Sequence, residues 1–139
     1  MSAEKAVKEA KRWFITAEDD LDTARILKKS EKYAHSCFHS QQAGEKALKS
    51  IWYFIDSDPW GHSIKMLIDG LKDEYKKLHE EMKTLEHIGS VLDRFYIPTR
   101  YPNGLPEMTP DIAFSEKDAE SCIAYAVEIL DKVKSILKI

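Results

Sequence analysis

Apolar residues recur at three- and four-residue spacing over most of this chain, a pattern typical of amphipathic helices. Between Ala3 and about Lys29 they are separated by charged residues, and the spacing predicts one long helix with a single buried stripe. Only five glycines and five prolines interrupt the 139 residues, of which 43% are hydrophobic and 32% charged. The sequence therefore predicts an all-α protein, an antiparallel up-and-down bundle of four to five helices in a single domain covering residues 1–139.

Turn-forming residues mark where the other helices begin and end. The predicted helices cover residues 3–29, 33–56, 62–72, 73–96 and 115–137. The fourth is expected to bend around Gly89, and Ser115 with Asp118 resembles a capping box at the start of the last helix. The segment from Ile97 to Pro110 contains four prolines and is the one long irregular stretch. Loops of this length in compact domains are usually functional or mobile.

Charge and composition narrow the classes of function. The net charge of −3 argues against a general nucleic-acid binder but leaves room for a local basic cleft. No segment has the apolar length of a membrane span, and the N-terminus lacks a signal-peptide pattern. The two cysteines, Cys37 and Cys122, lie at apolar positions of predicted helices and are expected to be reduced core residues. These features predict a cytoplasmic protein without membrane contact.

The helix predicted over residues 33–56 carries two polar residues on its buried face. Gln41 and Glu45 share that face with Leu48, Ile51 and other apolar side chains. An unpaired buried charge costs more free energy than the packing that it displaces, so both groups need partners. A second line on this helix offers only small side chains and favours close approach of a neighbouring helix: Ser36, Ser40, Ala43, Ala47 and Ser50.

Two arginines, three aromatic residues and two prolines crowd into residues 93–103. Prolines restrict the backbone on both sides of Arg100 and Tyr101. Arginine forms bidentate bonds with phosphates and carboxylates, and tyrosine can stack on a base. One interpretation is a nucleotide or RNA contact. The other, slightly favoured, is that Arg94 or Arg100 pairs with Glu45, so that Gln41 and Glu45 anchor this loop.

Other polar residues give weaker signals. Lys46 leaves the buried face of its helix and becomes a phosphate-binding candidate if Arg100 and Tyr101 lie on the same side. His35 and His39 stand one turn apart, but solvated or interface histidines explain them better than a metal does. The acidic run from Glu18 to Asp22 is interpreted as a solvated face. No metal site, no cofactor and no nucleophile arrangement is predicted.

Two segments give the chain a family resemblance. They are Gln41-Gln42-Ala43-Gly44-Glu45-Lys46-Ala47-Leu48-Lys49 and, before the final helix, Arg100-Tyr101-Pro102-Asn103. In order and separation they resemble the HEPN family, over about the whole chain. The resemblance implies a bundle of four or five helices, frequent homodimerisation, and nucleotide or RNA binding. It also implies a minimal nucleotidyltransferase as partner, in some cases as a toxin–antitoxin pair. The family places a histidine near His62, which makes His62 a weak site candidate.

The chain departs from the family in one respect. Ribonuclease members carry an arginine followed, after four to six residues, by a catalytic histidine. No histidine occurs after His87, so neither Arg94 nor Arg100 has such a partner. The expected function is therefore a non-catalytic nucleotide- or RNA-binding module, with a binding set of Arg94, Arg100, Tyr101, Asn103 and Lys46. A ribonuclease toxin with a non-standard site and a purely structural dimerisation or antitoxin-binding subunit remain the alternatives.

Overall fold

The computed structural model describes residues 2–139, and every regular element in that range is a helix. The long helices are α1 (Ala3–Lys29), α2 (Tyr33–Phe54) and α7 (Glu116–Leu137). The shorter elements are α3 (Ile64–Asp69), α4 (Lys76–Met82), the 3-10 turn η1 (Lys83–Leu85), α5 (Glu86–Asp93), the 3-10 turn η2 (Pro102–Gly104) and α6 (Pro110–Ala113). The prediction of an all-α helical bundle is confirmed.

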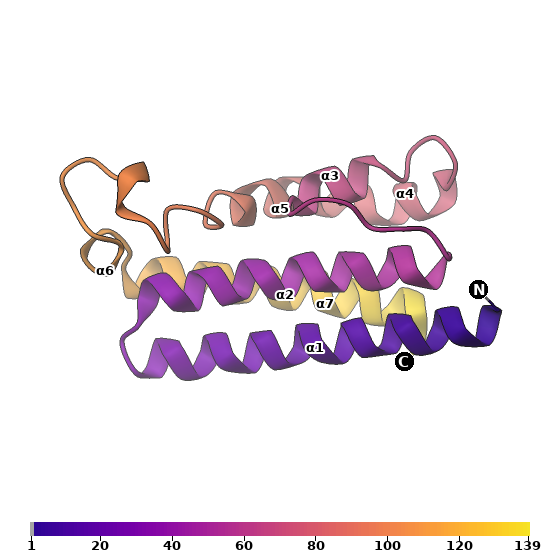
Figure 1. Cartoon of the computed structure of the whole chain (residues 1–139), viewed down its shortest axis with the longest axis horizontal. Helices are drawn as coiled ribbons and strands as arrows, with labels where there is room; N and C mark the ends of the chain where they lie inside the picture. Colours follow the sequence, from indigo (N-terminus) through magenta and orange to yellow (C-terminus); the bar gives the residue numbers. More distant parts are fainter. Residues whose placement is uncertain (1) are drawn as a thin grey trace.

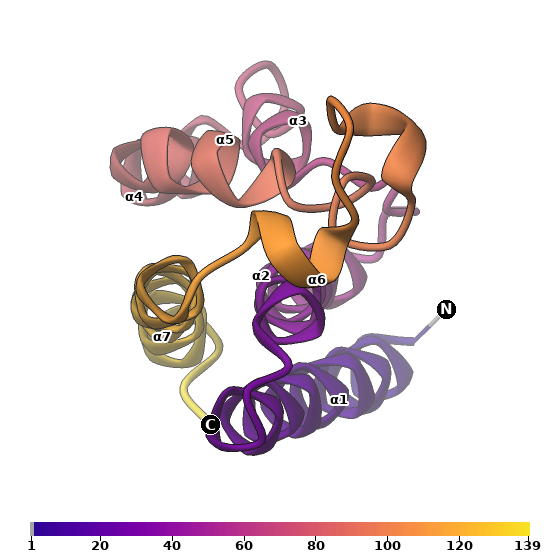
Figure 2. The ribbon, with the colours of Figure 1, turned by 90° about the vertical axis from the view of Figure 1, so that its left-hand side faces the viewer.

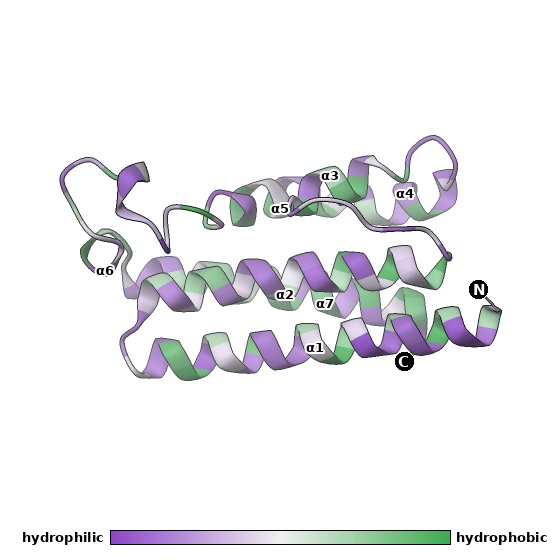
Figure 3. Cartoon of the chain, in the orientation of Figure 1, coloured by the Kyte–Doolittle hydropathy of each residue, from purple (hydrophilic) through white to green (hydrophobic). Residues whose placement is uncertain are grey.

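Helices α1, α2 and α7 lie side by side along the long axis of the molecule (Figure 1). Helices α3, α4 and α5 cover the side of α2 and α7 that faces away from α1 (Figure 2). Polar and apolar residues alternate along each long helix, as the helical period requires (Figure 3). Helix α2 is therefore surrounded on most sides, and its central residues from Ala43 to Glu45 are buried. None of the helices described is long and apolar enough to cross a membrane.

The small residues of α2 mediate its close contact with α1. All five residues of the predicted line are buried: Ser36, Ser40, Ala43, Ala47 and Ser50. The Ser36 hydroxyl donates a hydrogen bond of 2.7 Å to the carbonyl oxygen of Ala24 on α1. Small side chains permit this approach because they occupy little of the space between the two helix backbones.

The prediction of one long fourth helix was wrong. The helix breaks at η1 into α4 and α5, and the break does not lie at Gly89. Gly89 has a different role, since a Cβ atom at this position would lie 2.8 Å from Cγ2 of Ile64. The glycine is needed because α5 packs closely against α3. A packing requirement of this kind cannot be recognised from the sequence alone.

The start of α7 follows the sequence expectation. The Ser115 side chain accepts from the Asp118 backbone N–H, and the Asp118 carboxylate accepts from the Ser115 backbone N–H, which completes the capping box. Both cysteines are free and buried, as predicted. The stretch from Ile97 to Pro110 contains η2 and leads directly into α6, so it is less irregular than expected.

Candidate functional site

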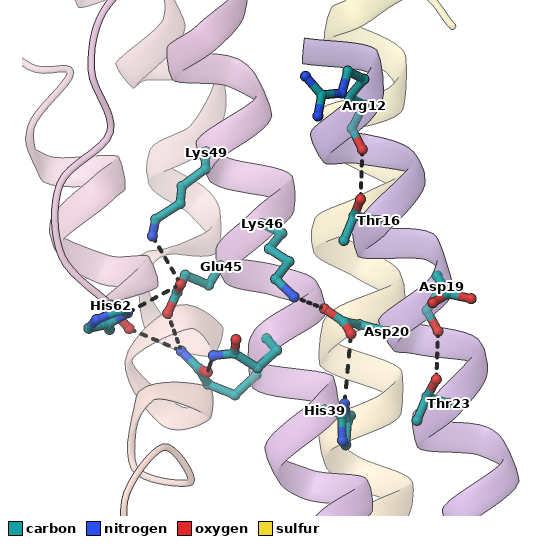
Figure 4. Close-up of polar contacts among 12 residues, drawn as sticks. Arg12, Thr16, Asp19, Asp20, Thr23, His39, Glu45, Lys46, Lys49 and His62 are labelled. Carbon is teal, nitrogen blue, oxygen red and sulfur yellow. Dashed lines mark hydrogen bonds and ion pairs between the residues drawn. The ribbon is translucent and has the colours of Figure 1, made fainter. Parts of the chain in front are cut away.

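The two polar residues on the buried face of α2 bind the segment that precedes α3. Gln41 is fully buried, and its side-chain amide donates a hydrogen bond of 3.0 Å to the carbonyl oxygen of His62. Glu45 is 3% exposed; its Oε2 lies 3.1 Å from Nζ of Lys49 and 3.5 Å from Nδ1 of His62 (Figure 4). Its charge is thus balanced by a lysine one turn along α2, and an imidazole nitrogen from another segment lies within hydrogen-bonding reach.

This arrangement corrects one prediction. Within residues 2–139, neither Arg94 nor Arg100 forms an ion pair with Glu45. Lys49 satisfies the carboxylate from within the same helix, so an arginine from the distant loop is not required. Gln41 and Glu45 hold the His62 segment, and the loop after α5 reaches this region only through aromatic contacts.

Asp93 fixes the other side of the His62 segment. Its carboxylate accepts hydrogen bonds from the Ser63 hydroxyl at 2.8 Å and from the backbone N–H groups of Ile64 at 2.8 Å and Lys65 at 3.1 Å. A carboxylate at a helix N-terminus satisfies donors that have no partner within the helix. The role of Asp93 was not foreseeable, because nothing in its sequence spacing shows that the end of α5 meets the start of α3.

The Arg100 guanidinium lies among three aromatic rings. Its central carbon is 4.4 Å from the ring centroid of Phe38, 4.6 Å from that of Tyr96 and 5.2 Å from that of Tyr101. Its Nε donates a hydrogen bond of 2.9 Å to the Tyr96 carbonyl oxygen. In the described part of the chain, no carboxylate pairs with this guanidinium and no acceptor meets its two terminal nitrogens. The ring faces stabilise the guanidinium cation, and its two terminal nitrogens can donate hydrogen bonds to an anion.

Tyr96 joins Arg100 to His62. The His62 ring stacks on the Tyr96 ring with centroids 5.0 Å apart and planes at 16°. The same tyrosine ring contacts the Arg100 guanidinium, so a histidine and an arginine meet at one aromatic side chain. The side chain of His62 is 61% exposed, which leaves its second nitrogen accessible to a ligand.

Of the other predicted binding residues, Tyr101 belongs to this cluster, whereas Arg94 and Lys46 do not. Tyr101 is 50% exposed beside Arg100, and Asn103 is exposed in η2. Arg94 is exposed at the end of α5, and no ion pair or ring contact involves it in the described residues. Lys46 forms an ion pair of 2.7 Å with Asp20 on α1, which weakens its case as a phosphate ligand.

Asp20 differs from the solvated acidic face that the sequence predicted. Its side chain is only 13% exposed and faces α2, where its Oδ1 lies 3.7 Å from Nδ1 of His39 (Figure 4). Burial works to raise the pKa of Asp20, but interactions with His39 and Lys46 outweigh it and lower the pKa below its ordinary value. Asp20 therefore remains an anion that ties α1 to α2.

Sequence comparison identifies the family. The pattern of the HEPN domain matches residues 10–136. The chain belongs to the HEPN family. This HEPN protein is 30% identical over 138 residues to a Methanocaldococcus jannaschii protein named "Putative toxin MJ1304", and the match covers 95% of this chain and 90% of that protein.

Solved structures agree with this assignment. The structure of TT1696 from Thermus thermophilus superposes with a TM-score of 0.82 at 32% identity, over 91% of this chain and 96% of that one. The archaeal HEPN homologue ST0689 gives a TM-score of 0.74 at 34% identity, over 92% of this chain and 97% of that one. A HEPN domain protein of Thermotoga maritima, tm0613, gives 0.68 at 27% identity, over 91% of this chain and 98% of that one.

Proposed function

We propose that this HEPN protein is a non-catalytic module that binds RNA or a nucleotide through the loop after α5. The observation that carries the proposal is the Arg100 guanidinium, which three rings hold in place and which lacks a carboxylate partner. Its terminal nitrogens can bind phosphate oxygens in bidentate geometry. Tyr101, half exposed beside it, can stack on a base.

The loop is suited to this task because its geometry is set before a ligand arrives. The Nε–Tyr96 hydrogen bond and the ring contacts restrict the guanidinium, so binding costs less conformational entropy. Arg94 and Asn103 are exposed in the same segment and can contribute further contacts to the phosphate backbone. Lys46 has the smallest expected contribution, since a ligand would have to compete with Asp20 for it.

A binding assay with Arg100→Ala tests the proposal. Fluorescence anisotropy with a labelled single-stranded RNA, and calorimetry with nucleotides, measure the affinity of the wild type. Arg100→Ala is expected to weaken binding at least about tenfold. It should also reduce the slope of log affinity against log salt concentration by about one, the contribution of one phosphate contact. Arg100→Lys should also bind more weakly, because it keeps the charge but loses the planar stack on the rings.

Arg25→Ala is the matched control, since Arg25 is an exposed arginine on α1 that pairs only with Asp22, at 3.5 Å. Its affinity should stay within about twofold of wild type. Thermal melting of each variant shows whether the fold is kept. The proposal fails if the wild type binds neither RNA nor nucleotide, or if folded Arg100→Ala binds as well as wild type.

We propose further that the protein forms a homodimer and acts with a minimal nucleotidyltransferase in a toxin–antitoxin pair. The similarity to a protein named as a toxin supports the pairing. The outward face of α1 supports the dimer, because its charges change sign at Ile15, which is 63% exposed. Over residues 8–22, the exposed charged residues of this face are Lys8, Lys11 and Arg12 before Ile15, and Glu18, Asp19 and Asp22 after it.

At 100° per residue around the helix axis, these six residues and Ile15 all point within about 60° of their mean direction. Two copies of α1 that cross antiparallel at Ile15 place Lys8 opposite Asp22, Lys11 opposite Glu18, and Arg12 opposite Asp19. A twofold interface requires this kind of self-complementarity. Affinity purification of the tagged protein from its native cells, followed by mass spectrometry, tests the partner, and the absence of a nucleotidyltransferase from the purified complex contradicts that part of the proposal.

A ribonuclease is the second candidate, and the shared contact at Tyr96 favours it. His62 and Arg100 meet at that ring although they are far apart in sequence, and Glu45 orients the His62 ring through Nδ1. A histidine oriented in this way can act as a general base through its other nitrogen. Wild type, His62→Ala and Arg100→Ala are incubated with RNA in the presence of a chelator. Cleavage by wild type that is lost in both variants supports the ribonuclease hypothesis. Wild-type cleavage no faster than that of the variants contradicts it.

A further inference from the structure

Three side chains from three different helices converge at the end of α3. Asp69 is the last residue of α3, His79 lies in α4, and Glu86 is the first residue of α5. One oxygen or nitrogen ligand atom from each lies within 4.8 Å of the other two. Nε2 of His79 lies 3.4 Å from Oε1 of Glu86. All three residues are partly buried, and none belongs to the site proposed around Arg100.

The chemistry of this cluster fits a borderline metal ion. An imidazole nitrogen and two carboxylate oxygens are common ligands of zinc, which adds a water as fourth ligand in an open tetrahedral site. Ligand atoms around zinc lie roughly 3.4 Å apart, given metal–ligand bonds of about 2.1 Å. From the 4.8 Å bound, the ligand atoms must therefore approach one another by at most about 1.4 Å, which side-chain rotation can supply.

The two carboxyl groups make the site unfavourable when no cation occupies it. Ligand oxygens of Asp69 and Glu86 lie within 4.8 Å of each other, so two acidic groups converge at one point. A divalent cation between them would offset the repulsion between the two carboxylates.

Lys65 already forms an ion pair with this cluster. Its Nζ lies 2.9 Å from Oδ2 of Asp69, and its side chain is 44% exposed. An exposed ion pair of this kind, at i and i+4 on a helix, contributes little free energy, so the lysine can move away when a divalent ion arrives. The lysine thus competes with the metal, and this competition supplies a variant that should gain affinity.

The site lies at the opposite end of α3 from the Asp93 cap. Asp93 joins the start of α3 to the end of α5, and a metal at Asp69 and Glu86 would join the end of α3 to the start of α5. It would also attach α4 through His79, although α4 makes few other contacts with α3. We propose that Asp69, His79 and Glu86 form a zinc-binding site that clamps α3, α4 and α5 together.

Zinc titration of chelator-treated full-length protein tests the site. Wild type should bind one zinc ion per chain with a dissociation constant on the order of micromolar, measured by calorimetry or chelator competition. Saturating zinc should raise Tm by several degrees, because the ion binds only the folded chain. Cobalt(II), used as a spectroscopic probe in place of zinc, should give the absorption of a tetrahedral site. Magnesium should have no such effect, because it prefers oxygen ligands in octahedral geometry.

Variants separate this site from other zinc ligands. His79→Gln and Glu86→Gln should each weaken zinc binding at least about tenfold, whereas Lys65→Met should strengthen it several-fold. His35→Gln removes an exposed histidine of α2 and should leave the affinity unchanged. Circular dichroism confirms that each variant is folded, and Lys65→Met provides an independent test should a ligand variant unfold.

Three results would overturn the proposal. They are the absence of saturable zinc binding by wild type, equal zinc affinity of wild type and folded His79→Gln, and loss of binding in His35→Gln.

Discussion

Asp20 shows how one half-buried carboxylate can connect two helices. It lies on α1, and its partners Lys46 and His39 both lie on α2, so its two oxygens face an ammonium and an imidazole of the neighbouring helix. These partners lower its pKa although burial alone would raise it. The pair with Lys46 is largely shielded from solvent, which makes it stronger than the exposed ion pairs along α1.

Asp20→Asn is expected to destabilise the protein by about 1–2 kcal/mol near neutral pH, because it leaves Lys46 and His39 without their anion. A carboxyl group whose pKa is lowered by folding stabilises the protein above its unfolded-state pKa, and this contribution is lost as the pH falls through the folded-state pKa. The difference from wild type should therefore be complete above the ordinary value of 3.8 and disappear in more acidic solution. Urea denaturation over a pH series measures it.

Asp73→Asn serves as the control, since Asp73 is exposed and has no ion pair in the described part of the chain. It should change the unfolding free energy by less than about 0.5 kcal/mol at every pH. If the effect of Asp20→Asn persisted unchanged in acid, the ionised carboxylate would not be its cause.

Gln41 and Glu45 show what sequence reasoning can establish about single residues. Helical spacing places both on the buried face of α2, and burial requires partners for both. Lys49 is foreseeable as a partner of Glu45 because it lies one turn along the helix. His62 is not, because it reaches Glu45 only after the chain turns back over α2. The position of Arg100 between Phe38 and Tyr96 depends on tertiary packing in the same way.

At the scale of helices, Ile64 connects three of them through two glycines. A Cβ atom at Gly44 of α2 would lie 2.8 Å from Cδ1 of Ile64, and a Cβ atom at Gly89 of α5 would lie 2.8 Å from its Cγ2. The first atom is the flexible end of the side chain, whereas the second is held close to the backbone. The two glycines therefore differ in how well they tolerate a methyl group.

Gly89→Ala is expected to lower the free energy of unfolding by about 1–3 kcal/mol, the range for an overpacked core. Gly44→Ala should cost less than about 1 kcal/mol, because Cδ1 can move and alanine has the higher helix propensity. Ile64→Val removes Cδ1 but keeps Cγ2, so it should relieve the cost of Gly44→Ala and not that of Gly89→Ala. Double-mutant cycles from chemical denaturation measure both couplings. Equal relief at the two glycines would contradict this account of the contacts.

The cysteines report on the packing of α2 against α7. Contact with Cys37 of α2, followed by burial, raises the pKa of the Cys122 thiol on α7. Since the thiolate is the reactive form, neither thiol should react measurably with Ellman's reagent in the native protein at mildly alkaline pH. Both should react after denaturation, which gives the control. Rapid modification of one thiol in the folded protein would show that the contact between α2 and α7 opens readily.

The break between α4 and α5 marks a limit of sequence reasoning about elements. Apolar residues keep helical spacing from Leu78 to Phe95, and no proline or turn-forming pair separates α4 from α5. The helix is interrupted at η1, where tertiary contacts of the buried residues Met82 and Leu85 take precedence over local periodicity. The long helices were predictable because each carries an apolar stripe, with turn signals or a capping box at its ends.

At the scale of the whole molecule, the outward face of α1 is the feature that the bundle itself does not use. Its inward stripe of Ala10, Phe14, Ala17 and Leu21 is buried in the core. Its outward face exposes Ile15 and Ile26 at 63% and 64% among the charged residues. The order of those charges, basic and then acidic about Ile15, suits a second copy of the same chain better than an unrelated partner.

Charge reversal on this face tests the proposed homodimer. In a dimer that crosses at Ile15, Lys11→Glu places two carboxylates opposite each other at two symmetric positions. The dissociation constant should therefore rise at least about tenfold. Glu18→Lys should weaken the dimer equally, because it opposes two ammonium groups. The double variant K11E/E18K restores opposite charges at both positions and should return the dissociation constant to near the wild-type value. Sedimentation or light scattering over a range of concentrations measures it. A monomeric wild type contradicts the homodimer, and a dimer that is insensitive to either reversal must use another face.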